Sequence, residues 1–218
     1  MKNIEEIKYY SPKEEKINII SHAIGFILSI YALVLLVTHA NLHGDVWHIV
    51  SFSIFGVSLI ILFAASTLYH SAKKSGLRSR LKIIDHASIY VLIAGTYTPF
   101  TLVTLNGTIG WAIFGISWGL ALTGIILKLF FTGKYNLIST IMYVLMGWVI
   151  IFAIKPLINN LPLEGLFWLF AGGISYTIGA ILYSIKKIKF NHAIFHIFVL
   201  IGGFCHFMSV FLYVLPGE

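Results

Sequence analysis

Residues 191–214 read NHAIFHIFVLIGGFCHFMSVFLYV, and this stretch decides the class of fold. It carries no Asp, Glu, Lys or Arg, and it is longer than the about 20 residues that a helix needs to cross a bilayer's hydrocarbon core. Its histidines are ionisable groups, which are costly inside a membrane and usually face the interior of a helix bundle. The stretch therefore predicts a transmembrane helix whose histidines need an explanation.

The composition of the whole chain leads to the same class. Hydrophobic residues make up 58% of the 218 residues, charged residues 11%, and the mean hydropathy is +0.91. A typical water-soluble domain has about 45–50% apolar and about 25% charged residues. A soluble globular protein and a disordered chain are both excluded, because too few charges are present to cover a soluble core and disordered chains have the opposite composition. The single cysteine, Cys205, excludes an intrachain disulfide.

Seven apolar runs are long enough to span a membrane. They cover residues 17–39, 46–69, 83–105, 108–131, 136–155, 163–185 and 191–214. We expect an all-α integral membrane protein with a polar tail over 1–16 and one seven-helix domain over 17–218. The tail does not resemble a secretory signal, because the apolar run after it is too long. Pro99 predicts a kink in the third span, because proline lacks the backbone donor that a helix uses.

The basic residues predict the orientation of these spans. Of the 15 Lys and Arg residues, all except Lys155 fall in the tail or in connections on the same side of the membrane. Since cytoplasmic loops carry an excess of Lys and Arg, the N-terminus is expected in the cytoplasm and the C-terminus outside. This pattern explains the net charge of +7 without nucleic acid as a partner. A multi-pass protein of the cell membrane is the expected localisation.

Two histidines of the last span share a helix face. His192 and His196 are four residues apart, so their imidazoles can reach one metal ion. The spacing is similar to the HExxH pattern of metalloproteases, but Ala193 stands where that pattern has its glutamate base. The pair alone leaves open whether these residues bind a metal or share a face by chance.

The predicted topology brings further polar residues to the same depth. His70 ends the second span, Asp85 opens the third, and His192 and His196 open the seventh, all on the cytoplasmic side. Three neutral imidazoles and a water molecule make a catalytic zinc site with an open position. Asp85 would then act as a base, and Ser66, on the face of His70, would hold the water or a substrate oxygen. The alternative is imidazoles and a solvated carboxylate paired with lipid headgroups or neighbouring spans.

Other polar residues are accessory candidates. His206 faces the same interior about 15 Å deeper along its helix, either as a buried, hydrogen-bonded histidine or as a proton relay or substrate contact. Glu15, Asn18 and His22 lie where the first span enters the membrane, where a helix cap and polar packing explain much of the pattern. Three histidines are expected in or beside the first external loop, solvated by water or forming a loose surface metal site: His39, His43 and His48.

The order of these motifs resembles the hemolysin III family, the bacterial branch of the progestin and adipoQ receptor superfamily. The motifs are Glu15-x-x-Asn18-x-x-Ser21-His22, Ser66-x-x-x-His70 with Asp85-His86, the run from Ala94 to Phe100, and His192-x-x-x-His196 with His206. The resemblance covers nearly the whole chain. It implies a seven-helix fold with a zinc ion near the inner leaflet, held by His70, His192 and His196, with Asp85 and Ser66 beside its water.

The resemblance also implies candidate functions. The eukaryotic relatives suggest a ceramidase-like zinc hydrolase that acts on amide or ester bonds of a membrane lipid, which would be the substrate or ligand. The name of the bacterial relatives suggests instead a pore-forming, cytolytic protein. A third hypothesis is a sensor or receptor of membrane state with a structural zinc. A light-driven pump is not expected, because the last span has no lysine for a Schiff base. The sequence does not identify the lipid or the oligomeric state.

Overall fold

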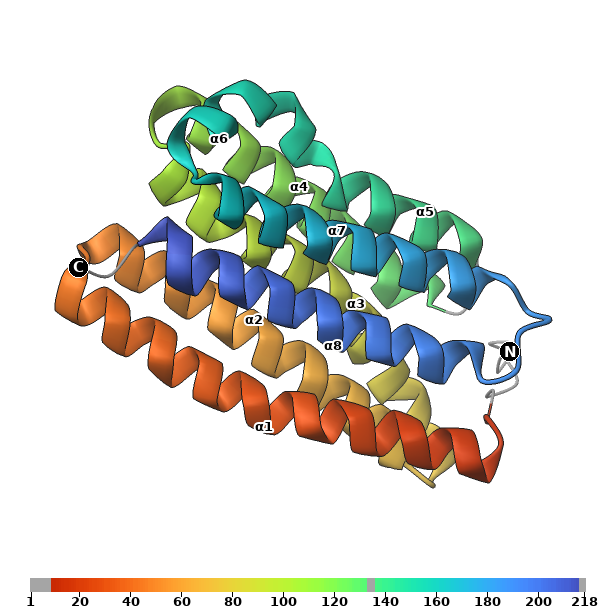
Figure 1. Ribbon diagram of the computed structural model, residues 1–218. Helices are drawn as coiled ribbons and strands as arrows, with labels where there is room; N and C mark the ends of the chain where they lie inside the picture. The colour runs from red at the N-terminus through yellow and green to blue at the C-terminus, as the bar shows by residue number, and fades with distance from the viewer. Residues whose placement is uncertain (1–8, 133–135, 216–218) are drawn as a thin grey trace.

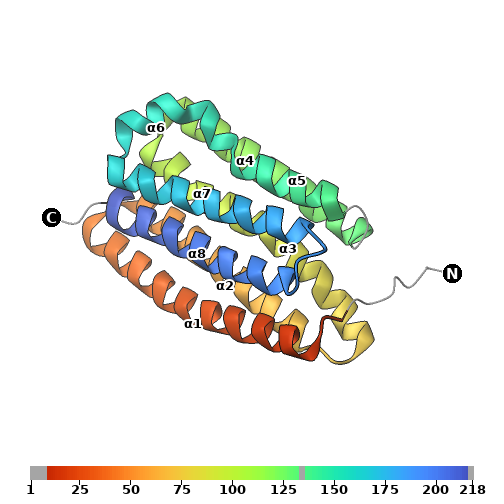
Figure 2. The ribbon, with the colours of Figure 1, turned by 45° about the vertical axis from the view of Figure 1, so that its right-hand side comes forward.

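The computed structural model describes residues 9–132 and 136–215, and within them the chain is helical. Figures 1 and 2 show long helices that run side by side in one bundle. The elements are α1 (Pro12–His43), α2 (Val46–Ser71), α3 (Ser75–Pro99), η1 (Phe100–Thr104), α4 (Gly107–Phe131), α5 (Asn136–Gly147), η2 (Val149–Ala153), α6 (Ile154–Asn160), α7 (Leu163–Ser184), α8 (Asn191–Ser209) and η3 (Val210–Val214). Elements η1 and η3 are π-helical, and η2 is a 3-10 helix.

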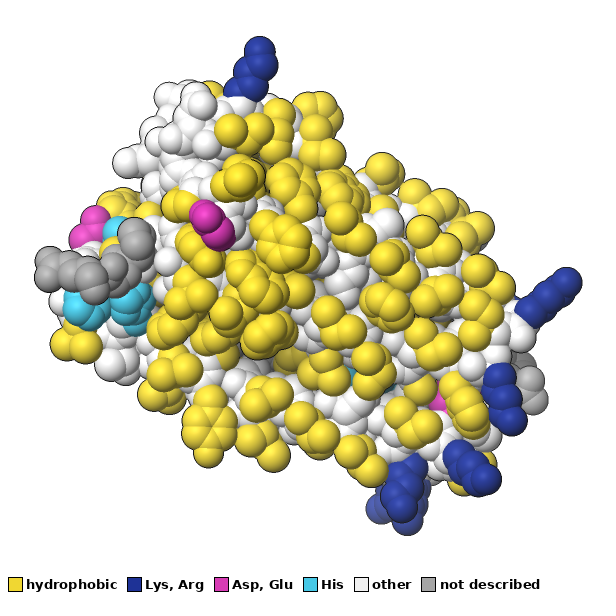
Figure 3. Space-filling view, viewed as in Figure 1, with side chains coloured by type: hydrophobic (Ala, Val, Ile, Leu, Met, Phe, Trp, Pro, Cys, Tyr) yellow, Lys and Arg dark blue, Asp and Glu magenta, His cyan; other side chains and the backbone are white. Residues whose placement is uncertain are grey.

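Seven helical segments are long and apolar enough to cross a membrane, which confirms the predicted all-helical, multi-pass fold. They are Pro12–His43, Val46–Ser71, Ser75–Thr104, Gly107–Phe131, Leu137–Asn160, Leu163–Ser184 and Asn191–Val214. In Figure 3 hydrophobic side chains cover the middle of the viewed face, and Lys and Arg gather mainly at the end where α8 begins. The predicted orientation and the division into a tail and one domain stay predictions. Residues 1–8 of that tail and Lys134 lie outside the described residues.

The packing of the helices places the last span beside the first span. Helix α1 packs against α2 and α8, α3 packs against α2 and α4, and α7 packs against α8. The start of α1 and the end of η3 lie at opposite ends of the bundle, as an odd number of crossings requires (Figures 1 and 2). The start of α8 therefore comes level with the end of α2 and the start of α1.

Two helices begin earlier than the apolar runs indicated. Helix α1 starts at Pro12, where the side chain of Ser11 accepts a hydrogen bond from the Glu14 backbone N–H and caps the helix. Helix α3 starts at Ser75 instead of residue 83. Hydropathy detects only the part of a helix that lies in hydrocarbon, so polar first turns escape it. The longer α3 places Arg78 and Asp85 seven residues apart on one helix face.

The third span changes its helical form at the predicted position. The α-helix ends at Pro99 and continues as the π-helical turn η1 from Phe100 to Thr104. Proline has no backbone N–H and its ring crowds the preceding turn, so a regular α-helix is disturbed there. Wider π-helical turns are a known response to such a local disturbance. The irregularity predicted from Pro99 is therefore confirmed in the form of a π-helical turn.

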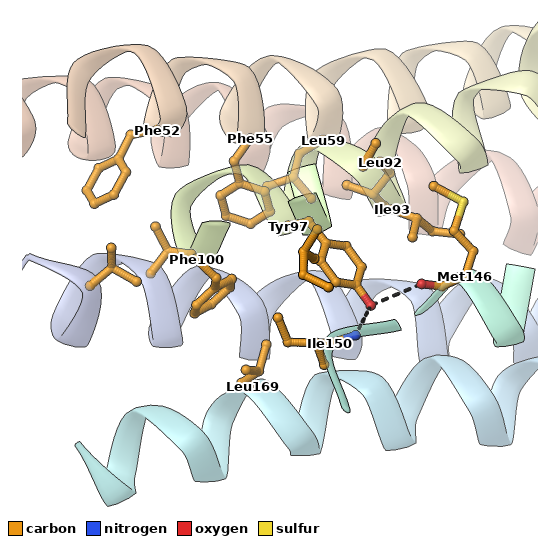
Figure 4. Close-up of a cluster of buried hydrophobic side chains, with 14 of the residues drawn as sticks. Phe52, Phe55, Leu59, Leu92, Ile93, Tyr97, Phe100, Met146, Ile150 and Leu169 are labelled. Carbon is orange, nitrogen blue, oxygen red and sulfur yellow. Dashed lines mark hydrogen bonds between the residues drawn. The ribbon is translucent and has the colours of Figure 1, made fainter. Parts of the chain in front are cut away.

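The fifth span is not the single helix that the sequence predicted over 136–155. It consists of α5, the 3-10 helix η2 and α6, with Pro156 in the first turn of α6. Tyr97 of α3 bridges the break: its hydroxyl donates to the Met146 carbonyl (3.0 Å) and accepts from the Ile150 N–H (3.1 Å). Figure 4 shows these bonds among buried side chains of the neighbouring helices. The tyrosine thus satisfies backbone groups that the broken span leaves without helical partners.

We expect Tyr97→Phe to destabilise the protein without changing its fold. The substitution leaves the buried Met146 carbonyl and Ile150 N–H without their partner, which costs about 1–3 kcal/mol. Thermal unfolding in detergent, followed by circular dichroism, measures the change. Tyr213→Phe, at a partly buried tyrosine near the other end of the bundle, is the control and should change the midpoint less. Equal midpoints for Tyr97→Phe and the unmodified protein would contradict the bridging role.

Candidate metal centre

Three imidazoles from two helices meet at one point. His70 lies in the last turn of α2, and His192 and His196 lie in the first turns of α8. The Nε2 atoms of His192 and His70 are 3.0 Å apart, and those of His196 and His192 are 3.1 Å apart. All three residues are buried, and one ligand atom from each lies within 4.8 Å of the others. The described residues contain this one cluster of His, Cys, Asp and Glu with metal-ligand geometry.

The three nitrogens have the chemistry and the spacing of a metal site. Nitrogen ligands at 2.0–2.1 Å from a tetrahedral zinc stand about 3.3 Å from one another, close to the separations found here. A metal ion binds neutral imidazoles through lone pairs that all point at the ion. Without an ion, such lone pairs would face one another and repel. The cluster could therefore hold one metal ion through His70, His192 and His196.

The start of α8 is fixed by contacts with neighbouring segments. The Asn191 side chain donates a hydrogen bond to the Tyr183 carbonyl at the end of α7 (2.6 Å), which sets the first turn of α8. The Tyr10 ring stacks on His192 with centroids 4.5 Å apart, and the His22 ring stacks on His196 at 3.6 Å. Burial raises the pKa of the Tyr10 hydroxyl above its usual range, so this ring stays neutral. Flat rings on two imidazoles limit how far these imidazoles can turn.

Glu15 orients the third imidazole. One oxygen of its carboxylate accepts a hydrogen bond from Nδ1 of His70 (2.6 Å), and Asn18 lies 3.4 Å from the same nitrogen. Because a carboxylate only accepts, we infer that Nδ1 carries the proton and that Nε2 presents its lone pair to the cluster. The other oxygen of Glu15 pairs with the guanidinium of Arg78.

Arg78 connects this carboxylate with the end of α2. Its side chain is 1% exposed, and it donates to the backbone carbonyls of Tyr69, His70 and Ala72 at 3.2–3.3 Å. The last carbonyls of a helix have no i+4 partner, and of these three only the Tyr69 carbonyl also accepts a bond from a backbone N–H at the helix end, that of Ala72. The guanidinium therefore satisfies the end of α2 and at the same time holds the carboxylate that orients His70.

We expect Glu15→Gln to weaken metal binding by about 10–100-fold, because the partner that fixes the ring and raises its basicity is lost. Titration of metal-free protein with zinc in competition with a chelator measures the affinity. Glu14→Gln is the matched control, since Glu14 is also buried in α1 but forms no described contact with a histidine of the cluster. Equal losses in the two variants would contradict the orienting role of Glu15.

Asp85 and Ser66 lie in the wall of a cavity that the cluster also borders. The cavity has a volume of ≈ 150 Å³ and lies among α2, α3, α4, α5, α7 and α8; its lining includes Ser66, Asp85, His192 and His196. Asp85 is buried, and its Oδ2 lies 3.2 Å from Nδ1 of His86. The Ser66 hydroxyl is buried and has no hydrogen-bond partner among the described residues. Both side chains thus line the same cavity as His192 and His196.

The accessory candidates have different surroundings. Glu15, Asn18 and His22 all contact histidines of the cluster, so capping and packing explain less of this group than the sequence suggested. His206 is buried, but its Nδ1 lacks the hydrogen bond expected of a structural histidine. His48 bonds to Asp45 in a capping box at the start of α2.

Two contributors were not found from the sequence. The apolar runs leave Arg78 in a connection between two spans, and its seven-residue spacing from Asp85 indicates a shared face only once the early start of α3 is known. Tyr10 lies before the first helix, and its contact with His192 depends on tertiary packing alone. No local pattern in the sequence reports such a contact.

Known proteins similar to this chain match it over most of its length. The Haemolysin-III related family matches residues 10–207. The chain is 50% identical to "Hemolysin-3" of Bacillus cereus over 204 residues, which cover 94% of this chain and 93% of that protein. It is also 50% identical to the "Hemolysin-3 homolog" of Bacillus subtilis, over 94% and 96% of the two chains. The human "Monocyte to macrophage differentiation factor" is 29% identical over 92% of this chain and 84% of that protein.

Proposed function

The chain belongs to the Haemolysin-III related family, and from this premise we propose that it is a zinc-dependent hydrolase of the cell membrane that cleaves an amide or ester bond of a membrane lipid. The observation that carries the proposal is the convergence of His70, His192 and His196 beside a mainly apolar cavity. The buried histidine cluster borders an apolar cavity that could hold a hydrocarbon chain, and this arrangement is suited to a lipid substrate.

Zinc is the ion that best suits this donor set. Neutral imidazoles are good zinc ligands, and three of them leave a fourth position for water or substrate, although copper and nickel would also bind such nitrogens. When bound, zinc supplies a Lewis acid and lowers the pKa of a coordinated water toward about 7.

The side chains of the cavity supply the remaining steps. Asp85 accepts the proton of the attacking water, because it is the carboxylate in the cavity wall. Ser66 donates its unpaired hydroxyl hydrogen to a substrate oxygen and orients the bond to be cleaved. The apolar lining takes up the lipid chain and keeps bulk water away from the reacting groups.

The basic residues support a site near the cytoplasmic leaflet. The cluster lies at the end of the bundle where α8 begins, and Lys and Arg gather at that end in Figure 3. If that end faces the cytoplasm, a substrate headgroup lies at the interface while its chains remain in hydrocarbon.

The proposal is tested with purified protein in lipid nanodiscs that contain one amide-linked or one ester-linked lipid at a time. We expect release of a fatty acid that stops on metal removal by a chelator and returns when zinc is added. Absence of release from every lipid, in folded protein that contains zinc, would contradict the hydrolase proposal.

The names of the bacterial relatives favour a second candidate, a cytolytic membrane protein. Leakage of a dye from vesicles that contain the protein tests it. Pore formation and a sensor with a structural zinc both tolerate Asp85→Asn, whereas hydrolysis does not. Leakage that is equal in the unmodified protein and in Asp85→Asn, without lipid hydrolysis, would support the second candidate.

A further inference from the structure

The cavity extends beyond the metal cluster to a second pair of polar rings. Its lining continues to His206 of α8 and Tyr176 of α7, whose ring centroids are 5.3 Å apart. His206 follows His196 by ten residues, which corresponds to about 15 Å along the helix axis. Most of the lining between the two sites is apolar, with Val199 and Ala180 as examples. One long chain could therefore reach both sites, whereas a small polar molecule would meet mainly hydrocarbon.

Two glycines hold these rings in place. A Cβ atom at Gly172 of α7 would lie 2.6 Å from Nε2 of His206, and one at Gly202 of α8 would lie 2.3 Å from Cε1 of Tyr176. Each ring thus packs directly on the backbone of the opposite helix. Such close contact through small residues is typical of helix pairs in membranes. The glycine in the facing helix therefore leaves the space that each ring occupies.

Further bonds between the same helices make this arrangement rigid. The Ser175 hydroxyl donates to the Phe198 carbonyl (2.9 Å), and the Ser209 hydroxyl donates to the Gly165 carbonyl (2.8 Å). Along α8 these bonds, at Phe198 and Ser209, lie on both sides of Gly202 and His206. The pair is consequently a preorganised site that would not need rearrangement to accept a ligand.

Both rings carry polar atoms without a partner. The Nδ1 atom of His206 and the hydroxyl of Tyr176 are buried, and neither has a hydrogen-bond partner among the described residues. An unsatisfied buried polar atom costs about 1–3 kcal/mol, so native proteins nearly always provide a partner. Imidazole nitrogen and phenol together can donate and accept. A ligand hydroxyl group, which also does both, can bond to both atoms of this pair.

We propose that His206 and Tyr176 bind a hydroxyl group on the hydrophobic chain of the lipid, far from the bond at the metal cluster. The substrate class is accordingly a lipid whose chain is hydroxylated well below its headgroup. This inference takes from the proposed function only that the ligand is a lipid. The two polar atoms select the hydroxylated chain, and the apolar lining between the sites binds the methylene groups.

The test compares two free fatty acids that need no hydrolysis: stearic acid and stearic acid with a hydroxyl midway along its chain. Their affinities are measured by thermal shift in nanodiscs of saturated phosphatidylcholine. We expect the hydroxylated acid to bind roughly tenfold more tightly, as two neutral hydrogen bonds allow. Tyr176→Phe should remove most of this preference, since it deletes one oxygen and keeps the ring against Gly202.

Tyr213→Phe is the matched control, because Tyr213 of η3 is a partly buried tyrosine that is not one of the residues lining the cavity. It should keep the preference for the hydroxylated acid. Equal affinity of the unmodified protein for both acids would overturn the proposal and indicate that water fills the pair. A preference that survives in Tyr176→Phe, or binding of neither acid, would overturn it as well. A retained preference without any lipid hydrolysis would contradict only the proposed enzymatic function.

Discussion

Asp85→Asn is expected to lower lipid hydrolysis by about 10²–10⁴-fold, the usual contribution of a general base. The amide keeps the size of the carboxylate but cannot accept the proton of the attacking water. The zinc content should stay the same, because Asp85 is not one of the three clustered residues. Rates of fatty acid release, divided by the zinc content of each preparation, measure the effect.

Asp45→Asn is the matched control for this substitution. Asp45 is exposed and caps α2, where asparagine caps a helix about as well. The control should retain full activity. Activity of Asp85→Asn within a few-fold of the unmodified enzyme would contradict the role of Asp85, and loss of zinc in this variant would assign Asp85 to the metal site instead.

His192→Ala is expected to remove the bound metal. The His192 ring nitrogen is close to both other imidazoles of the cluster, so its loss leaves only two of the three ligands. The affinity should fall by more than the roughly 10–100-fold expected for Glu15→Gln, which keeps all ligands. Elemental analysis after dialysis against trace zinc measures the metal content.

The same substitution should also lower thermal stability when zinc is present. A metal that binds only the folded state stabilises it by mass action, and this contribution disappears with the site. His43→Ala, at an exposed histidine at the end of α1, is the control and should retain metal and stability. Stoichiometric zinc in His192→Ala would contradict the three-histidine site.

The fold could largely be predicted because membrane spans have a strong local signal. Hydropathy located all seven spans, and Pro99 indicated where the third would become irregular. Hydropathy could not show that the fifth span is broken, because the segment Leu137–Asn160 as a whole still qualifies as one span by length and apolar composition. The break depends on Pro156 and on a tyrosine from another helix, which a window along the chain does not combine.

The centre of the candidate site could also be predicted, since it depends on helix ends. His70, His192 and His196 lie at positions that topology brings to one level, and a helical spacing of four already pairs the last two. Their surroundings could not be predicted in the same way. Arg78 reaches Glu15 only because α3 begins early, and Tyr176 meets His206 through glycines of facing helices.

X-ray absorption at the zinc edge of the purified, unmodified protein tests the central claim most directly. The account predicts about one zinc per chain, with three imidazole nitrogens at about 2.0–2.1 Å and one further light atom. A site with another ligand set, or folded protein without zinc after purification in the absence of chelators, would contradict it.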